Sequence, residues 1–193
     1  VVDLSRHLDL ITLEAHEGHA HAHHDVGHHH HAGVNPHIWL SPRMVKTVAM
    51  TLTESLVQTY PGDAAFFREN LERFSATLDS IDHQIAGKLE GLQNRSFFIY
   101  HPSLSYFARD YGLDQVPMDM GGKTPSSGYM KELTDLGREK EIRVIFLQMQ
   151  FDQQNAEVLS KEIGAAIVQI NPLDPEWDRQ MLEIADKLKT YLQ

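Results

Sequence analysis

The 193-residue sequence contains no cysteine. Disulfide bonds and zinc sites built on thiolates are therefore excluded, while the compartment of the protein stays open. No apolar run approaches the ~20 residues that a transmembrane helix requires, so we expect no membrane span. An initiator methionine and a signal peptide are also missing, because the chain starts at Val1-Val2-Asp3-Leu4. This beginning indicates a processed or truncated piece whose targeting signal is lost.

Basic residues are too few to balance the acidic ones. The chain has 17 Lys and Arg against 27 Asp and Glu, which gives a formal net charge of −10. Because no basic patch is available to neutralise phosphates, nucleic acid is not an expected partner. The acidic balance suits a cation as ligand, although an acidic surface also simply keeps a protein in solution.

Sequence signatures of catalysis are missing as well. Neither His-Glu-x-x-His nor Gly-x-Ser-x-Gly occurs, so the metalloprotease and hydrolase signatures are absent. The stretch Gly121-Gly122-Lys123-Thr124 is similar to the end of a phosphate-binding loop. The earlier glycine of that pattern falls at Pro117, however, which has no N–H to donate. We therefore do not expect an enzyme.

Histidine, in contrast, is abundant in one tract. Between positions 16 and 31 the residues that separate the histidines are Gly, Ala, Val, Glu and Asp. Segment 16–34 therefore has almost nothing to bury and is predicted to be a mobile loop. Imidazole is the commonest metal-binding side chain, which favours weak capture of metal at several sites. An expression tag, a pH-responsive loop and an idle low-complexity insert are the alternatives. The tract holds nine of the chain's 13 histidines, namely His16, His19, His21, His23, His24, His28, His29, His30 and His31.

His37 differs from the tract that precedes it. It stands between Pro36 and the bulky pair Ile38-Trp39, which restricts its backbone and favours packing. Ser41-Pro42 then predicts the start of a helix, with serine as the N-cap and proline at the first helical position. A histidine directly before a helix has a defined place. From the residues alone, both a structural role and a role as metal ligand stay open.

Two helices are expected after His37. The first is predicted from Pro42 to about Tyr60 and ends at Pro61-Gly62. The second is predicted from about Asp63 to Leu89, where apolar residues recur at spacings of three and four. A helix of that length spans roughly 40 Å at 1.5 Å per residue, which suits a spine joining two lobes. A core helix within a single domain is the alternative.

From Ser96 onward, strand patterns alternate with helix patterns, which predicts an α/β fold: a four-stranded parallel sheet flanked by helices and preceded by the long spine helix. A further strand end is expected at Val1–Leu4, followed by a short irregular or helical stretch. The four strands are predicted at Phe97–Tyr100, Leu113–Met118, Arg143–Gln148 and Ala166–Ile170. The helices are predicted at Ser103–Tyr111, Ser127–Lys140, Gln153–Ile163 and after Asp174-Pro175.

Ligands of such sheets bind beyond the carboxyl ends of the strands. In this chain those ends carry His101, Asp119, Gln148 and Asn171. His101 could therefore converge with His37 on one metal ion. A zinc site needs about four N or O ligands in tetrahedral geometry, so the loop, water or a missing segment must complete it. Asn171 is read more simply as a turn residue, and Asp174 as a helix N-cap.

Several segments of the chain, taken in order, resemble the zinc/manganese solute-binding proteins of ABC importers, the ZnuA/TroA-like group. The histidine-rich loop runs into Asn35-Pro36-His37-Ile38-Trp39-Leu40-Ser41-Pro42, which is similar to the family's Asp-Pro-His-x-Trp-x-x-Pro. Tyr100-His101-Pro102-Ser103-Leu104-Ser105-Tyr106-Phe107 is similar to its His-Asp-Ala-Phe-x-Tyr-Phe segment. The match continues through Thr124-Pro125-Ser126, the segment from Phe146 to Phe151, and Asn171-Pro172-Leu173.

The resemblance implies a two-lobed receptor with a long helix between its lobes and metal in the cleft. His37 and His101 match two family ligands, whereas the family's first histidine lies in an amino-terminal lobe that this chain lacks. The family's two carboxylates fall on Asn171 and Gln148, which are amides, and Asn171 stays a weaker candidate ligand. The acid after the second histidine is Pro102 here, so His101 would lack that orienting partner.

On this interpretation residues 1–15 are a remnant of the amino-terminal lobe, 16–34 the histidine-rich loop, 35–60 the metal-ligand segment with its helix, 61–91 the spine helix and 92–193 the carboxy-terminal lobe. The expected function is high-affinity zinc binding in the periplasm or elsewhere outside the cytoplasm, with delivery to the membrane permease of an ABC importer. Manganese is less favoured because two oxyanions are missing. A monomer is expected, with a lipid anchor at the missing amino terminus as an option.

Two other functions stay open from the sequence. A metal-dependent enzyme could use an open zinc position to activate water, but it would need a general base and a substrate pocket. A stand-alone zinc buffer would use only the loop. The buffer predicts that deletion of residues 16–31 abolishes all binding, whereas the receptor predicts the loss of only the weaker sites.

Overall fold

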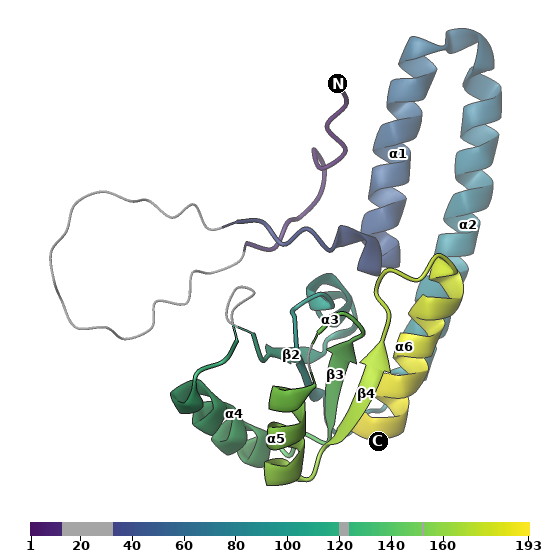
Figure 1. Ribbon diagram of the computed structural model, residues 1–193. Coiled ribbons are helices and arrows are strands. Elements are labelled where there is room, and N and C mark those ends of the chain that lie inside the picture. The colour runs from purple at the N-terminus through teal and green to yellow at the C-terminus, as the bar shows by residue number, and fades with distance from the viewer. Residues whose placement is uncertain (13–32, 120–123, 152) are drawn as a thin grey trace, which may run out of the picture.

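The computed structural model describes residues 1–12, 33–119, 124–151 and 153–193, and it confirms the predicted α/β fold (Figure 1). Alternating strands and helices form one lobe, and two long antiparallel helices precede it. The helices are α1 (Pro42–Thr59), α2 (Ala64–Lys88), α3 (Ser105–Tyr111), α4 (Ser127–Glu139), α5 (Gln154–Ile163) and α6 (Trp177–Leu192). The strands are β1 (Ser96–Ile99), β2 (Asp114–Pro117), β3 (Val144–Gln148) and β4 (Ala166–Ile170), and two 3₁₀ turns are η1 (Ile38–Leu40) and η2 (Pro61–Asp63).

The four strands form one parallel sheet in the order β2-β1-β3-β4. The chain moves outward from β1 to β2 and then returns to place β3 on the other side of β1. The strand order therefore reverses between β1 and β3, and in open parallel sheets such a switch point is where ligands bind, beyond the carboxyl ends of the strands. His101 follows β1 and Gln148 ends β3, so both lie at this point.

Successive side chains of the strands alternate between two cores. Phe97, Ile99 and Phe146 pack on one face together with residues of α2, α3 and α6. Phe98 and Ile145 pack on the other face, where α4 and α5 cover the sheet. The apolar runs of the central strands are explained by this arrangement, because a parallel strand with helices on both faces buries both of its sides.

Helices α1 and α2 form a hairpin that extends well beyond the sheet lobe (Figure 1). Ser41 caps α1 as predicted: its hydroxyl accepts a hydrogen bond from the Met44 N–H at 3.0 Å. The lower part of α2 is buried at Leu78, Ile81 and Ile85. Farther along the hairpin, apolar side chains such as Phe66 stay exposed, at 63% of the full value.

Two local predictions were wrong. Val1–Leu4 is not a strand, because Asp3 accepts hydrogen bonds from the N–H and hydroxyl of Ser5 at 3.0 and 2.6 Å and so forms a turn. Asp174 does not cap α6, because its carboxylate accepts from the Glu176 N–H at 2.9 Å and the helix begins only at Trp177. In both cases the short acidic side chain bonds to the backbone two residues ahead, which favours a turn.

Candidate metal centre

His37 and His101 come together although they lie 64 positions apart in the sequence. Their ring centroids are 5.2 Å apart with an interplanar angle of 71°. His37 enters from the turn before α1, and His101 enters from the end of β1. Two imidazoles at this separation could contact one ion, because zinc–nitrogen bonds are ~2.0–2.1 Å long. The predicted convergence of these two residues is therefore present in the fold.

Asn35 holds His37. Its Oδ1 lies 2.7 Å from His37 Nδ1 and also accepts the backbone N–H of His37 at 3.0 Å. The other end of the amide donates to the Pro102 carbonyl at 3.1 Å and to the Ser105 hydroxyl at 2.9 Å. These partners identify Oδ1 as the acceptor, so Nδ1 of His37 carries the proton. Nε2 is then the nitrogen with a free lone pair.

Asp119 holds His101. Its Oδ2 lies 2.6 Å from His101 Nδ1, and its side chain is only 1% exposed. A carboxylate only accepts, so this contact also places the proton on Nδ1 and leaves Nε2 free. The orienting contact that Pro102 cannot supply to His101 is thus made by Asp119. Asp119 follows a predicted strand, but nothing in its local sequence links it to His101.

Gln148 bonds to the backbone of His101 on both sides. It is buried, its Nε2 donates to the His101 carbonyl at 2.6 Å and to the Ser103 hydroxyl at 2.9 Å, and its Oε1 accepts the His101 N–H at 3.3 Å. Because these bonds use both ends of the amide, Gln148 is positioned to hold the backbone of His101.

Asn171 remains a predicted ligand only. Its Oδ1 accepts the Leu173 N–H at 3.3 Å, which is the behaviour of a turn residue. Its neighbour Pro172 is linked to the segment of His37, because the Pro172 carbonyl accepts a hydrogen bond from the Nε1–H of Trp39 at 3.0 Å. The Trp39 ring in turn lies 5.3 Å from the ring of His37. Within the described parts of the chain, no cluster of three His, Asp or Glu side chains is arranged to hold a metal.

Burial lowers the pKa of His37 below the ordinary value of a histidine, and the neighbouring His101 lowers it further. The charge of Asp119 acts in the opposite direction with a smaller effect. A lowered pKa keeps this imidazole neutral at and above neutral pH. Neutral imidazole is the form that binds metals, so the environment of His37 suits a ligand.

The described residues that flank the predicted loop lie beside this centre. Thr12 and Val34 form an antiparallel bridge, and the Asn35 N–H donates to the Ile11 carbonyl at 2.8 Å. These two paired segments form a stem, and the Tyr106 hydroxyl bonds to both of them. It donates to the Asn35 carbonyl at 2.7 Å and accepts the Ile11 N–H at 3.2 Å. The nine histidines from His16 to His31 lie outside the described residues.

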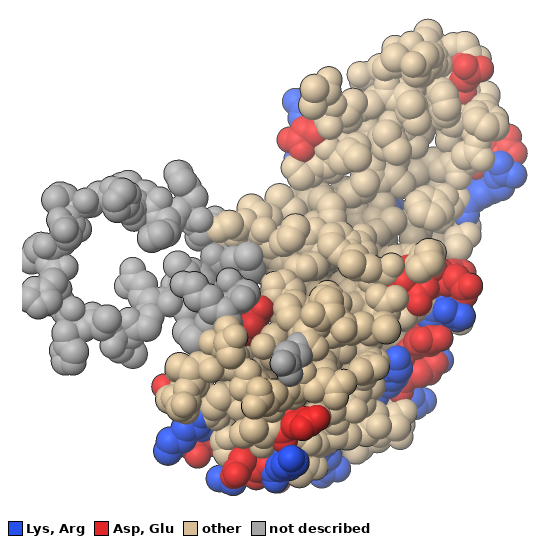
Figure 2. Space-filling view, viewed as in Figure 1, with Lys and Arg blue, Asp and Glu red and all other residues tan. Residues whose placement is uncertain are grey.

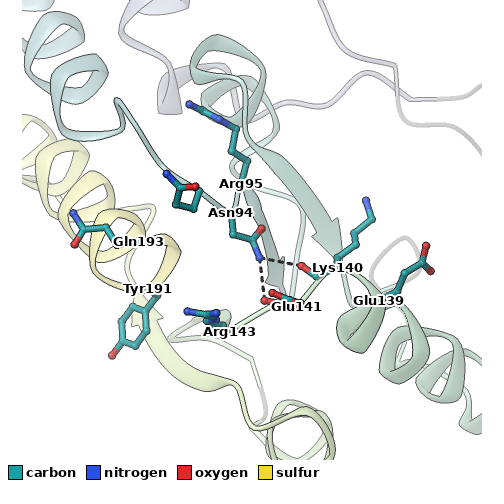
Figure 3. Close-up of a pocket in the computed structure, with 9 residues that line it drawn as sticks. Asn94, Arg95, Glu139, Lys140, Glu141, Arg143, Tyr191 and Gln193 are labelled. Atoms are coloured by element: carbon teal, nitrogen blue, oxygen red, sulfur yellow. Dashed lines mark hydrogen bonds between the residues drawn. The ribbon is translucent and has the colours of Figure 1, made fainter.

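A hollow of about 510 Å³ lies at the opposite edge of the sheet, among residues that precede β1 and β3 and residues at the end of α6 (Figure 3). Asn94 crosses it, with Nδ2 donating to the carbonyls of Lys140 and Glu141 at 2.9 and 3.0 Å. Its lining contains cations and acids but no histidine. We therefore place the candidate site at the carboxyl ends of the strands.

Comparison with known proteins identifies the family of the chain. The family described as zinc-uptake complex component A periplasmic, ZnuA, matches residues 1–193. The chain belongs to the ZnuA family. The zinc-binding lipoprotein AdcA of Streptococcus pneumoniae is 33% identical over 171 residues, which cover 86% of this chain and 34% of AdcA. The names of these relatives describe binding proteins rather than enzymes, in agreement with the expectation from the sequence.

Solved structures of ZnuA share the fold. A crystal structure of ZnuA is 34% identical, with a TM-score of 0.78 over 83% of this chain and 63% of the other. A zinc-bound deletion mutant of ZnuA is 29% identical, with a TM-score of 0.84 over 100% of this chain and 68% of the other. The chain thus spans about a third of the length of AdcA (34%) and roughly two thirds of these ZnuA structures.

None of the helices in the described residues has both the length and the apolar character that crossing a bilayer requires.

Proposed function

We propose that this chain is the carboxy-terminal part of an extracytoplasmic receptor that binds zinc and delivers it to the permease of an ABC importer. One observation carries the proposal: His37 and His101 lie side by side, and each has its Nδ1 bonded to a fixed acceptor. Orientation of a ligating imidazole through its second nitrogen is the usual arrangement in metal sites. Membership of a periplasmic zinc-uptake family supports both the location and the delivery step.

Zinc is proposed over manganese because the described ligands are nitrogens. Manganese prefers oxygen ligands, whereas imidazole suits zinc. The two positions where the resemblance expects acids hold Gln148 and Asn171, and Gln148 is already engaged with the His101 backbone. Zinc affinity should therefore exceed manganese affinity. Equal affinities of the protein for the two ions would contradict this selectivity.

A second lobe is proposed to complete the site and to cover the hairpin. The ZnuA crystal structure extends beyond the matched part, because the match covers 63% of it. Charged side chains are sparse on the face of the hairpin seen in Figure 2, whereas both signs are dense along the lower rim of the sheet lobe. Phe66, Phe74 and Tyr60 of the hairpin are exposed at 63%, 44% and 55%. Exposed apolar side chains of this size suit burial against another lobe, which would make residues 61–91 a spine and would leave the whole receptor a monomer.

The decisive experiment is a zinc titration by calorimetry on the chain with residues 16–31 deleted. The deletion is feasible because the stem between Ile11 and Asn35 brings the flanking residues together. We expect one site to remain, and we expect His37→Ala with His101→Ala to abolish it. His83→Ala is the matched control, because His83 is exposed on α2, away from the sheet edge.

Two other outcomes are informative. A site that survives in the double variant with unchanged affinity would show that the histidine pair is not the zinc site. Complete loss of binding on deletion would favour the loop as a stand-alone buffer. Repeating the titration on the full-length protein then tests whether the proposed second lobe supplies essential ligands.

A further inference from the structure

The backbone pairing of β1 with β2 places Asp119 beside His101. Hydrogen bonding between β1 and β2 continues past the end of β2: the Met118 N–H donates to the Ile99 carbonyl at 2.8 Å, and the Asp119 N–H donates to the Tyr100 carbonyl at 2.9 Å. These bonds fix the backbone of Asp119 beside that of His101. The position of the carboxylate is therefore set by the sheet and does not depend on a loop.

The surroundings of Asp119 are unusual for a carboxylate. Its side chain is 1% exposed, Oδ2 contacts His101 Nδ1, and Oδ1 has no hydrogen-bond partner among the described residues. Burying an incompletely paired carboxylate destabilises a fold, and no cation of Lys or Arg offsets it in the described ion pairs. A buried negative charge of this kind becomes favourable when a positive ion binds nearby.

We propose that Asp119 is the positioning residue of the metal centre, which holds His101 in the Nδ1–H tautomer and supplies the negative charge that offsets a divalent cation bound at Nε2. The inference rests on the proposed function and deepens it. Amides stand at Gln148 and Asn171, where the resemblance expects acids. The negative charge that offsets the ion therefore comes from Asp119, which bonds to the ligand His101, and not from a carboxylate that binds the ion directly. A carboxylate bonded to a ligating imidazole also raises the basicity of that ligand.

Two variants separate the hydrogen bond from the charge. Asp119→Asn keeps an acceptor for Nδ1–H but removes the charge, and Asp119→Ala removes both. Asp114→Asn is the matched control, because Asp114 lies at the other end of β2 and pairs with Lys140 at 2.5 Å. All variants are made in the full 193-residue chain with the nine loop histidines replaced by glutamine, so that zinc binding reports on the histidine pair.

The first readout needs no metal. Nitrogen-15 NMR of the His101 ring at neutral pH should show a proton on Nδ1 in the parent chain and in the Asp114→Asn control. Asp119→Ala should shift the ring toward the Nε2–H tautomer, while Asp119→Asn should keep Nδ1–H in part. An unchanged tautomer in Asp119→Ala would overturn the inference whether or not the chain binds zinc.

The second readout is zinc affinity by competition with a chelating dye. Loss of an orienting partner typically weakens metal binding about 10–100-fold, so we expect a loss in that range for Asp119→Ala and a smaller loss for Asp119→Asn. Unchanged affinity in Asp119→Ala would overturn the inference, and so would a loss as large as that of His101→Ala, because that result makes Asp119 a direct ligand. If the parent chain binds no zinc at the pair, the proposed function fails, and the tautomer alone then decides the positioning role.

Discussion

The two histidines of the candidate metal centre lie in contact, yet they are held in different ways. His37 is oriented by Asn35, a neutral amide only two residues away in the sequence. His101 is oriented by Asp119, a buried carboxylate that reaches it across the β1–β2 pair. Both arrangements put the proton on Nδ1 and leave Nε2 for an ion. Orientation of a ligand is thus obtained once by local sequence and once by tertiary structure.

The difference has an electrostatic consequence. Asn35 is fixed by bonds to Pro102 and Ser105, so it defines the ring position of His37 without adding charge. Asp119 brings a negative charge to one side of the pair only. Variants on the two sides should therefore differ: changes around His101 should combine loss of geometry with loss of charge, and changes around His37 should affect geometry alone.

The largest effect is expected at Gln148, which braces the His101 side. Gln148→Ala should lower the free energy of unfolding by about 3 kcal/mol, because the His101 N–H and carbonyl and the Ser103 hydroxyl all lose a partner. Gln148→Glu should also destabilise the fold, since a carboxylate cannot donate to the His101 carbonyl. Denaturant unfolding measures both, with Gln150→Ala as an exposed control. Wild-type stability in Gln148→Glu would show that the donor is dispensable.

The next effect is expected at Asn35, on the His37 side. Asn35→Ala should weaken zinc binding about 10–100-fold, equivalent to about 1.4–2.8 kcal/mol, because the His37 ring loses its orienting acceptor. Competition titration in the chain with the loop histidines replaced measures this loss. Asn70→Ala serves as control, since the Asn70 amide bonds within α2, to the Phe66 carbonyl and the Arg73 side chain, in the part of the chain that the structure describes. Unchanged zinc affinity in Asn35→Ala would contradict the claim that Asn35 orients His37 as Asp119 orients His101.

A smaller effect is expected where the segment before α1 meets the end of β4. Trp39→Phe removes the N–H that reaches the Pro172 carbonyl, and Trp177→Phe removes the N–H that reaches the Trp39 carbonyl. Each substitution keeps most of the aromatic surface and should cost about 1 kcal/mol of stability. Thermal unfolding of both variants and of the double variant checks this. If a variant loses more free energy of zinc binding than free energy of unfolding, this contact also helps to position His37.

The smallest effect is expected from the titration of His37. Its folded-state pKa is lowered by burial, so the folded chain binds fewer protons there than the unfolded chain. Stability is then unaffected above the unfolded pKa and falls as the pH drops from that value through the folded pKa. Between about pH 7.5 and about pH 5, His37→Gln should lose less stability than wild type. An NMR titration of the metal-free chain that finds the His37 pKa at or above 6.5, the ordinary value, would contradict this.

Much of the fold could be predicted from the sequence because its signals are local. Apolar runs identified the four strands, Ser41-Pro42 identified the start of α1, and Gly112 and Gly164 end α3 and α5 in the left-handed conformation. The prediction failed at Val1–Leu4 and Asp174, where a single side-chain hydrogen bond redirects the backbone. Such bonds compete with regular structure and leave only a weak composition signal.

By itself the sequence determined the parallel α/β lobe and the place of His101 at the carboxyl ends of its strands, because alternation of strands and helices fixes which ends of the strands meet. Only the tertiary structure decided what holds each imidazole. The Asp119 carboxylate meets His101 through the register of β1 on β2, and Gln148 meets the same residue because β3 lies on the other side of β1. Contacts between separate strands depend on register and burial, which no local pattern of residues encodes.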